Sequence, residues 1–221
     1  MGKLIHKTME KLASLLFPDR CAGCRRIGTL FCFSCRTKSR KSRKENISLP
    51  FLDKLYHWGL YSDTALQNAL RHLKYHGAFG LSHPLSDMLM ELIKPHLSSY
   101  AGYADPPVVI PIPTSRDRLS SRGYNQAELL GQALAEKTAL LFLPDTLIKT
   151  MPTKTQVELK GKERVLNVMG SFGVNNASNI AGKTVLLVDD ISTTGATLSE
   201  AARVLKEAGA KEVAGLVVAR G

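Results

Sequence analysis

One segment near the C-terminal end constrains the fold more than any other part of the chain. An apolar run at 184–188 leads into a polar loop, then into a helical pattern that can end at Gly209, and then into a second apolar run at 213–218. Apolar runs joined by a helix are typical of parallel strands that are buried on both faces. The segment therefore predicts an α/β protein, with a parallel sheet flanked by helices.

The loop of this unit carries residue types that suit a sugar phosphate. Asp189 and Asp190 follow the first run, where two carboxylates can accept hydrogen bonds from vicinal ribose hydroxyls and lie near a divalent cation. The residues after them offer hydroxyls, a permissive backbone and a helix N-terminus, which together favour a dianionic phosphate. These phosphate candidates are Ser192, Thr193, Thr194, Gly195, Ala196 and Thr197. The alternative is an aspartate pair that only happens to lie beside a threonine-rich helix cap. Thirteen consecutive positions, 185–197, all fit a sugar-phosphate loop, which weighs against this alternative.

A second polar loop follows a strand that we predict at 108–110. Its hydroxyl and guanidinium groups suit phosphate oxygens, and loops at the carboxyl ends of parallel strands are where such sheets bind ligands. The candidates are Thr114, Ser115, Arg116, Arg118 and Arg122. A helix is expected next, from about Arg122 or Gly123 through Glu136. Arginines that simply face solvent after a strand are the alternative.

The segment from 151 to 168 is rich in basic and polar residues. Its first half is typical of a loop, and a short helix is expected over 157–168. In a binding site, such a segment can close over an anionic ligand and exclude water. A plain connector explains the same composition equally well.

The four cysteines form two Cys-x2-Cys pairs separated by seven residues. They are Cys21, Cys24, Cys32 and Cys35. Four thiolates complete the tetrahedral shell of a structural Zn²⁺ site, whereas two disulfides would need an oxidising compartment. Charges interrupt the apolar residues at 3–16, so no secretory signal is expected. The prediction is therefore structural zinc in a cytoplasmic protein.

Charge divides the chain into two predicted parts. The net charge is +11, and residues 1–50 hold 12 Lys and Arg against 3 Asp and Glu, so most of the excess lies in this head. We expect residues 1–50 to form an amphipathic helix, a zinc finger and a basic linker, and residues 51–221 to form the main domain. A basic head favours nucleic acid or another anionic surface, although solubility alone also explains it.

The candidate nucleic-acid residues form a stretch that is also typical of a solvated linker. They are Arg36, Lys38, Arg40, Lys41, Arg43 and Lys44. Phe31 and Phe33 can stack on bases or fill the small core of the zinc module. The helix at 3–16 can pack on the main domain or make peripheral contact with a membrane surface. No apolar run reaches the ~18 residues that a membrane-spanning helix needs.

The segment Val185-Leu-Leu-Val-Asp-Asp-Ile-Ser-Thr-Thr-Gly-Ala-Thr197 resembles the phosphoribosyl-pyrophosphate (PRPP) signature of the type I phosphoribosyltransferases. Further motifs make the chain similar to the ComF family, which includes ComFC and amidophosphoribosyltransferase-like proteins. They are the paired cysteines, Leu73-Lys74-Tyr75, Ile110-Pro-Ile-Pro113, Arg118, Arg122-Gly-Tyr-Asn-Gln126, Thr155-Gln156, Arg164, Asn167 and Gly170-Ser-Phe172.

The resemblance implies a type I phosphoribosyltransferase fold with a flexible hood, which binds PRPP with Mg²⁺. It implies that Asp189 and Asp190 lie on the ribose, that residues 193–197 hold the 5′-phosphate, and that residues 112–116 lie near the pyrophosphate. Further pocket candidates are Arg118, Arg122, Asn125, Gln156 and Arg164.

Family members are associated with natural transformation (competence) and with a DNA-translocating, helicase-like partner. Three functions stay open. The chain can be a phosphoribosyltransferase with Asp189 and Asp190 as catalytic residues, a PRPP-binding protein that handles single-stranded DNA, or a PRPP sensor without turnover. The retained acids and hydroxyls favour a working pocket, and the basic head favours the DNA role. No segment clearly recognises a base, so the acceptor is open.

Overall fold

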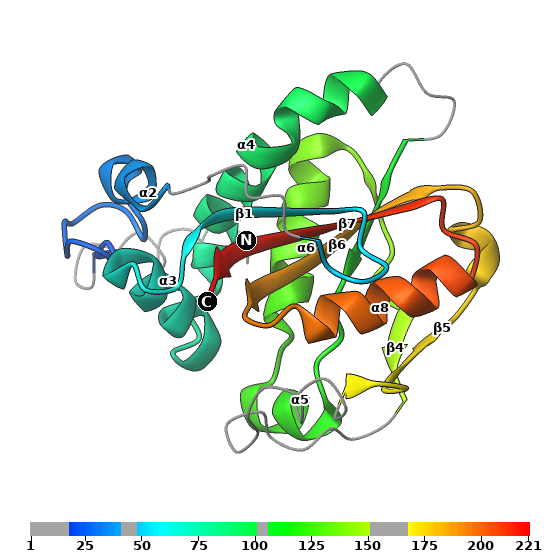
Figure 1. Ribbon diagram of the computed structural model, residues 1–221. Helices are drawn as coiled ribbons and strands as arrows, with labels where there is room; N and C mark the ends of the chain where they lie inside the picture. Colours follow the sequence, from blue (N-terminus) through cyan, green and yellow to red (C-terminus); the bar gives the residue numbers. More distant parts are fainter. Residues whose placement is uncertain (1–17, 41–47, 101–105, 151–167) are drawn as a thin grey trace, which may run out of the picture.

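The computed structural model describes residues 18–40, 48–100, 106–150 and 168–221. Its central strands are β1 (Lys54–Leu60), β2 (Val108–Pro111), β3 (Leu141–Phe142), β6 (Thr184–Ser192) and β7 (Glu212–Arg220). They form one sheet in the order β1-β7-β6-β2-β3, and every neighbouring pair is parallel (Figure 1). The predicted parallel sheet is therefore confirmed.

Helices cover both faces of this sheet. Side chains of β6 alternate, so Leu186 and Val188 pack on one side while Val185 and Leu187 pack on the other. The first side is covered by α3 (Thr64–Tyr75), α4 (Ser82–Tyr100) and α6 (Gln126–Thr138). The second side is covered by α8 (Ala196–Glu207) and an antiparallel pair, β4 (Leu147–Lys149) and β5 (Phe172–Val174) (Figure 1). Short 3₁₀ turns lie at η1 (Phe79–Leu81) and η2 (Ala177–Asn179).

The C-terminal unit forms as predicted, except that its first strand is longer. Strand β6 continues through Ser192, because β7 provides a pairing partner along its whole length, including Val217 for Asp189 and Arg220 for Ser192. The two aspartates therefore belong to the end of a strand and not to the loop. Gly209 adopts a left-handed φ of +97° after α8, in the region that favours glycine.

The helix expected from about Arg122 or Gly123 through Glu136 is present as α6 (Gln126–Thr138), but it begins later than expected and a separate helix precedes it. The chain forms α5 (Arg116–Arg122), turns at Gly123 with φ +82°, and begins α6 at Gln126. Ser115 caps the first helix by accepting a hydrogen bond from the backbone N–H of Arg118 at 3.4 Å. A cap and a left-handed glycine close together favour two short helices over one.

The cysteine region packs against β1 and the helices on one face of the five-stranded sheet. Cys21, Phe31 and Cys32 are buried in the same apolar cluster as Trp58 and the helices α3 and α4. Residues 33–39 form α2 (Phe33–Ser39), so a solvated linker at 36–40 is the wrong interpretation. The indole Nε1 of Trp58 donates to the Arg36 carbonyl at 3.0 Å, which attaches α2 to β1.

Some predictions lie outside the described residues. They are the helix at 3–16, the cations Lys41, Arg43 and Lys44, and the segment with Gln156 and Arg164. In the described parts of the chain, no helix has both the length and the apolar character needed to cross a membrane.

Candidate functional site

A polar pocket lies where β2 and β6 end. These strands are neighbours, with Pro111 opposite Val188, so the segments after them meet at one edge of the sheet. The pocket brings together predicted residues from both segments: Thr114, Ser115, Arg118, Arg122, Asn125, Asp189, Asp190, Ser192, Thr193, Thr194, Gly195, Ala196 and Thr197. Arg116 is exposed at the start of α5 and does not line the pocket.

Residues 193–197 form a turn that leads into the N-terminus of α8. Gly195 has φ +81°, and a Cβ there would come within 2.5 Å of the Leu49 side chain. The turn therefore requires glycine for both its backbone angle and its packing. The N-cap residue Gly195 has no side chain to cap α8, and Oγ1 of Thr194 accepts a hydrogen bond from the N–H of Ala196 at 3.4 Å. The dipole of the helix favours an anion at this end. We call residues 193–197 the phosphate cradle.

The two aspartates have different surroundings. Asp190 is 6% exposed, and its Oδ2 lies 2.8 Å from Nζ of Lys74 in α3. Burial, followed by the charge of Asp190, raises the pKa of Asp189 to about 8, while Lys74 acts in the opposite direction. Lys74 belongs to a motif noted in the sequence, but its ion pair with Asp190 was not predicted.

Asn125, on the side of the pocket formed by the segment after β2, has a structural role. Its side-chain Nδ2 donates to the carbonyl of Ile112 at 3.0 Å, and its Oδ1 accepts from the N–H of Ala127 at 3.1 Å. These two bonds join the loop after β2 to the start of α6. Asn125 therefore positions the loop that carries Thr114 and Ser115.

Lys149 and Phe172 complete the lining from the small β4–β5 sheet, where they are paired residues. The Nζ of Lys149 lies 5.6 Å from the Phe172 ring centroid. Burial and the nearby charge of Arg118 lower the pKa of Lys149. No sequence pattern indicated Lys149, because its neighbours in the chain carry no recognisable motif.

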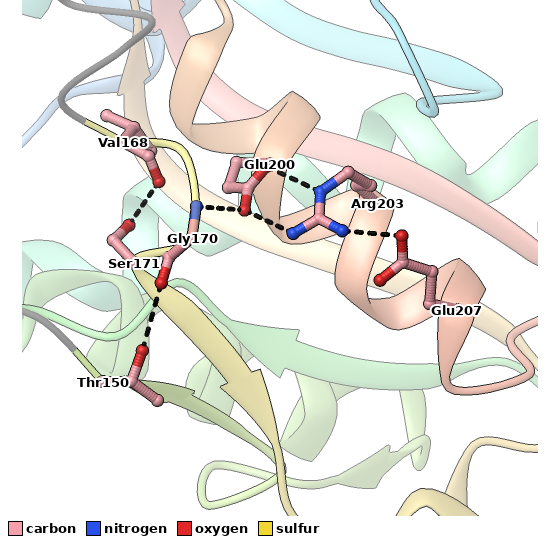
Figure 2. Close-up of polar contacts among 7 residues, drawn as sticks. All are labelled: Thr150, Val168, Gly170, Ser171, Glu200, Arg203 and Glu207. Atoms are coloured by element: carbon pink, nitrogen blue, oxygen red, sulfur yellow. Dashed lines mark hydrogen bonds and ion pairs between the residues drawn. The ribbon is translucent and has the colours of Figure 1, made fainter.

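A carboxylate on α8 holds this small sheet in place (Figure 2). Glu200 is 6% exposed and accepts a hydrogen bond from the N–H of Gly170 at 2.7 Å. Arg203 donates to the same carboxylate from Nε at 2.9 Å and from Nη2 at 2.7 Å. Thr150 adds a hydroxyl bond to the Gly170 carbonyl at 3.4 Å. The helix that begins at the phosphate cradle thus also anchors the strand that carries Phe172.

The pocket suits a ligand with several negative charges. Four cations line it, and they come from three elements, α3, α5 and β4: Lys74, Arg118, Arg122 and Lys149. Asp190 is paired with Lys74, and the remaining cations and the N-terminal residues of α8 line the pocket with them. Guanidinium groups bind phosphate oxygens with good geometry.

The four cysteine sulfurs form a separate cluster that fits a metal ion. All four lie within 4.8 Å of one another, and Sγ of Cys24 and Cys32 are 3.7 Å apart. Zinc–sulfur bonds of about 2.3 Å in a tetrahedron require sulfurs about 3.8 Å apart. Burial alone would raise the pKa of Cys21, but hydrogen bonds from the backbone of Cys32, Cys24 and Gly23 lower it to about 6. The donor set therefore fits a structural zinc ion.

The predicted nucleic-acid cations are only partly free in the described region. Arg36 pairs with Asp87 at 3.0 Å, and Arg40 pairs with Glu91 at 3.6 Å. Lys38 is exposed on α2. Phe31 is 1% exposed and fills the core, whereas Phe33 is 72% exposed.

Several known proteins and one family model are similar to this chain. The model of the phosphoribosyl transferase domain matches residues 131–221. Competence protein F of Haemophilus influenzae is 30% identical over 74% of this chain and 71% of its own length. Competence protein ComFC of Bacillus subtilis is 38% identical over 46% of this chain and 39% of its own length. DNA utilization protein YhgH of Escherichia coli K12 is 28% identical over 67% of this chain and 64% of its own length.

The match to competence protein F extends over most of both chains, while this chain covers less than two thirds of ComFC and YhgH. The residues matched by the domain model include the aspartate pair and the whole phosphate cradle. The chain belongs to the ComF family and contains a phosphoribosyl transferase domain.

Proposed function

We propose that this chain binds PRPP with Mg²⁺ in the pocket at the ends of β2 and β6. The observation that carries the proposal is the presence of two anion-binding elements in one pocket with an aspartate pair. These elements are the phosphate cradle and the loop with Thr114, Ser115 and Arg118. PRPP has a phosphate at one end of its ribose and a pyrophosphate at the other, so it needs two such elements.

Each part of the pocket has a task in this proposal. The cradle binds the 5′-phosphate through backbone N–H groups and threonine hydroxyls. Asp189 and Asp190 accept hydrogen bonds from the ribose hydroxyls, and Arg118 and Lys149 bind the pyrophosphate. Mg²⁺, held by carboxylate and pyrophosphate oxygens, supplies charge neutralisation to the pyrophosphate.

The wider role that we propose is the handling of single-stranded DNA during natural transformation. Its support comes from the relatives, which are named competence protein F, ComFC and DNA utilization protein. The excess of positive charge in residues 1–50 also favours a polynucleotide. A helicase-like competence protein is the partner expected from the family resemblance.

Calorimetry with PRPP and Mg²⁺ tests the pocket. The double variant Asp189→Asn with Asp190→Asn should reduce the affinity for PRPP at least about 100-fold, because each lost charge-assisted hydrogen bond contributes about 1.5–3 kcal/mol. Asp145→Asn is a matched control, since Asp145 is exposed and does not line the pocket. Unchanged affinity in the double variant would refute the assignment.

Transferase turnover is a second candidate, favoured by the cations that can stabilise a leaving pyrophosphate. These are Arg118 and Lys149 in the pocket wall. The test is to incubate the protein with PRPP, Mg²⁺ and a panel of bases, amines and oligonucleotides, and to follow pyrophosphate release. Release that depends on one acceptor supports turnover, and binding without release supports a protein that only binds or senses PRPP.

A further inference from the structure

The pocket itself offers no open aromatic face to a nucleobase. Phe172 is the one aromatic side chain among the described residues that line it, and it is 5% exposed. Lys149 also lies against its ring. Bases are held without sequence preference by stacking on open rings. A stacking partner for a base near this pocket must therefore come from outside its lining.

Tyr75 provides an open ring at the edge of the pocket. It is the last residue of α3 and follows Lys74 directly, and its side chain is 67% exposed. The guanidinium carbon of Arg122 lies 5.5 Å from the centre of the Tyr75 ring. Because Arg122 also lines the pocket, a single side chain connects the ring to the proposed PRPP site.

Neighbouring contacts hold this ring and this cation together. The hydroxyl of Tyr124, two residues after Arg122, donates to the carbonyl of Leu73, two residues before Tyr75. Phe79 packs edge-on against the Tyr124 ring, with centroids 4.6 Å apart. The end of α3 is thus tied to the turn after α5, and the surface is preformed.

The exposed surface continues from Tyr75 toward the cysteine cluster. The exposed rings of His72 in α3 and of His76 directly after it have centroids 4.9 Å apart and are tilted by 43° to each other. Arg25, between the two cysteine pairs, lies within electrostatic reach of His72. Alternating cations and rings suit a single strand, whose phosphates pair with cations and whose bases stack on rings.

We propose that Tyr75 and Arg122 form a nucleobase-stacking site at the mouth of the pocket, occupied by a base of single-stranded nucleic acid. The site rests on the proposed function, since it places the strand beside bound PRPP. Tyr75 supplies the stacking face, and Arg25 contacts the phosphate backbone. The strand therefore lies along α3, away from Arg36 and Arg40, whose guanidinium groups already pair with Asp87 and Glu91.

The test uses the full chain and a single-stranded oligonucleotide that contains 2-aminopurine, whose fluorescence is quenched when it stacks. Tyr75→Ala should abolish the quenching and weaken binding between about fivefold and 150-fold, because one base stack contributes about 1–3 kcal/mol. Tyr75→Phe keeps an aromatic ring and should retain both. Phe33→Ala removes another exposed ring, on α2, and should leave both unchanged.

The dependence of affinity on salt separates stacking from phosphate contacts. Tyr75→Ala should leave the slope of log Kd against log salt unchanged, whereas Arg25→Ala should reduce it by about 0.7, the loss of one phosphate contact on a single strand. Calorimetry with PRPP should give wild-type affinity for Tyr75→Ala, so failure of this site and failure of the PRPP pocket are distinguishable.

Three outcomes would overturn the proposal. The first is full quenching in Tyr75→Ala. The second is loss of quenching in Phe33→Ala with Tyr75→Ala unaffected, which would move the base to α2. The third is Tyr75-dependent quenching of free 2-aminopurine riboside that no oligonucleotide displaces, which would assign the ring to a small acceptor and not to a strand.

Discussion

The ammonium group of Lys74 lies 2.8 Å from a carboxylate oxygen of Asp190, so helix α3 compensates one of the two acids at the end of β6. The side chains are 23% and 9% exposed, so water screens the pair weakly. Asp189 lies next to this pair, and its N-terminal neighbours are fully buried. Without the lysine, two adjacent carboxylates would repel each other in a poorly hydrated pocket.

Lys74→Met should therefore destabilise the protein. Methionine retains much of the apolar stem but leaves the charge of Asp190 uncompensated, and we expect a loss of about 2–4 kcal/mol in the free energy of unfolding. Urea unfolding at pH 7 measures this loss.

Lys137→Met is the matched control. Lys137 pairs with Asp87 at 2.7 Å outside the pocket, and Asp87 keeps Arg36 as a partner when Lys137 is replaced. The control should lose less than about 1 kcal/mol. Equal, small losses in both variants would contradict the prediction.

Asp189→Asn should stabilise the protein at alkaline pH while weakening PRPP binding. Burial and then the charge of Asp190 raise the pKa of Asp189 from 3.8 to about 8 on folding. The folded state thus binds a proton that the unfolded state releases, so stability falls as the pH rises from about 4 to about 8. We expect a higher Tm than wild type at pH 8, with the difference shrinking toward pH 4. A Tm lower than that of wild type at pH 8, measured without added Mg²⁺, would contradict the raised pKa of Asp189.

The C-terminal unit could be predicted because its signals are local. The apolar runs of β6 and β7, the helical pattern of α8 and the glycine at 209 all lie between Thr184 and Arg220, and each follows from periodicity or turn chemistry. The phosphate cradle belongs to the same stretch. It could therefore be recognised before the fold was known.

The rest of the site depends on contacts between distant parts of the chain. Lys74 and Asp190 are 116 positions apart, and nothing near Lys74 indicates its partner. Lys149 lines the pocket from a strand that pairs with β5, and Glu200 anchors Gly170 just before β5; no local pattern predicts these contacts. Residues 36–39, which the composition predicted as part of a linker, likewise belong to α2, which packs against Trp58. The sequence gives the charge of such residues, but tertiary contacts determine which groups lie beside that charge.

Glu200→Ala should weaken both folding and PRPP binding. The hydrogen bond from Arg203 lowers the pKa of Glu200, burial opposes this, and the N–H of Gly170 lowers it further. The carboxylate therefore stabilises the fold above the unfolded pKa of 4.5, and this contribution is lost as the pH falls through the depressed pKa of the folded state. We expect a loss of about 1–3 kcal/mol at pH 7. The difference from wild type should narrow in acid.

Glu207→Ala provides the control for this variant. Glu207 pairs with the same Arg203 at 2.6 Å, but its side chain is 64% exposed and holds no backbone group (Figure 2). Its loss should change the free energy of unfolding by less than about 1 kcal/mol and leave PRPP affinity intact. If Glu207→Ala weakened PRPP binding as much as Glu200→Ala, the anchoring of Gly170 would not explain the effect.

Removal of zinc should be visible at Trp58, the single tryptophan of the chain. Its indole donates to the Arg36 carbonyl at 3.0 Å and to Oγ of Ser39 at 3.2 Å, and it shares a core with Cys21 and Phe31. Without metal, the cysteine region loses its cross-link, α2 separates from β1, and the indole meets water. A chelator under reducing conditions should therefore shift tryptophan emission to longer wavelength and lower Tm, and Cys21→Ser should do the same.

PRPP affinity should persist, because no cysteine lines the pocket. Metal analysis that finds no zinc in protein purified under reducing conditions would contradict the prediction, as would unchanged emission after chelation.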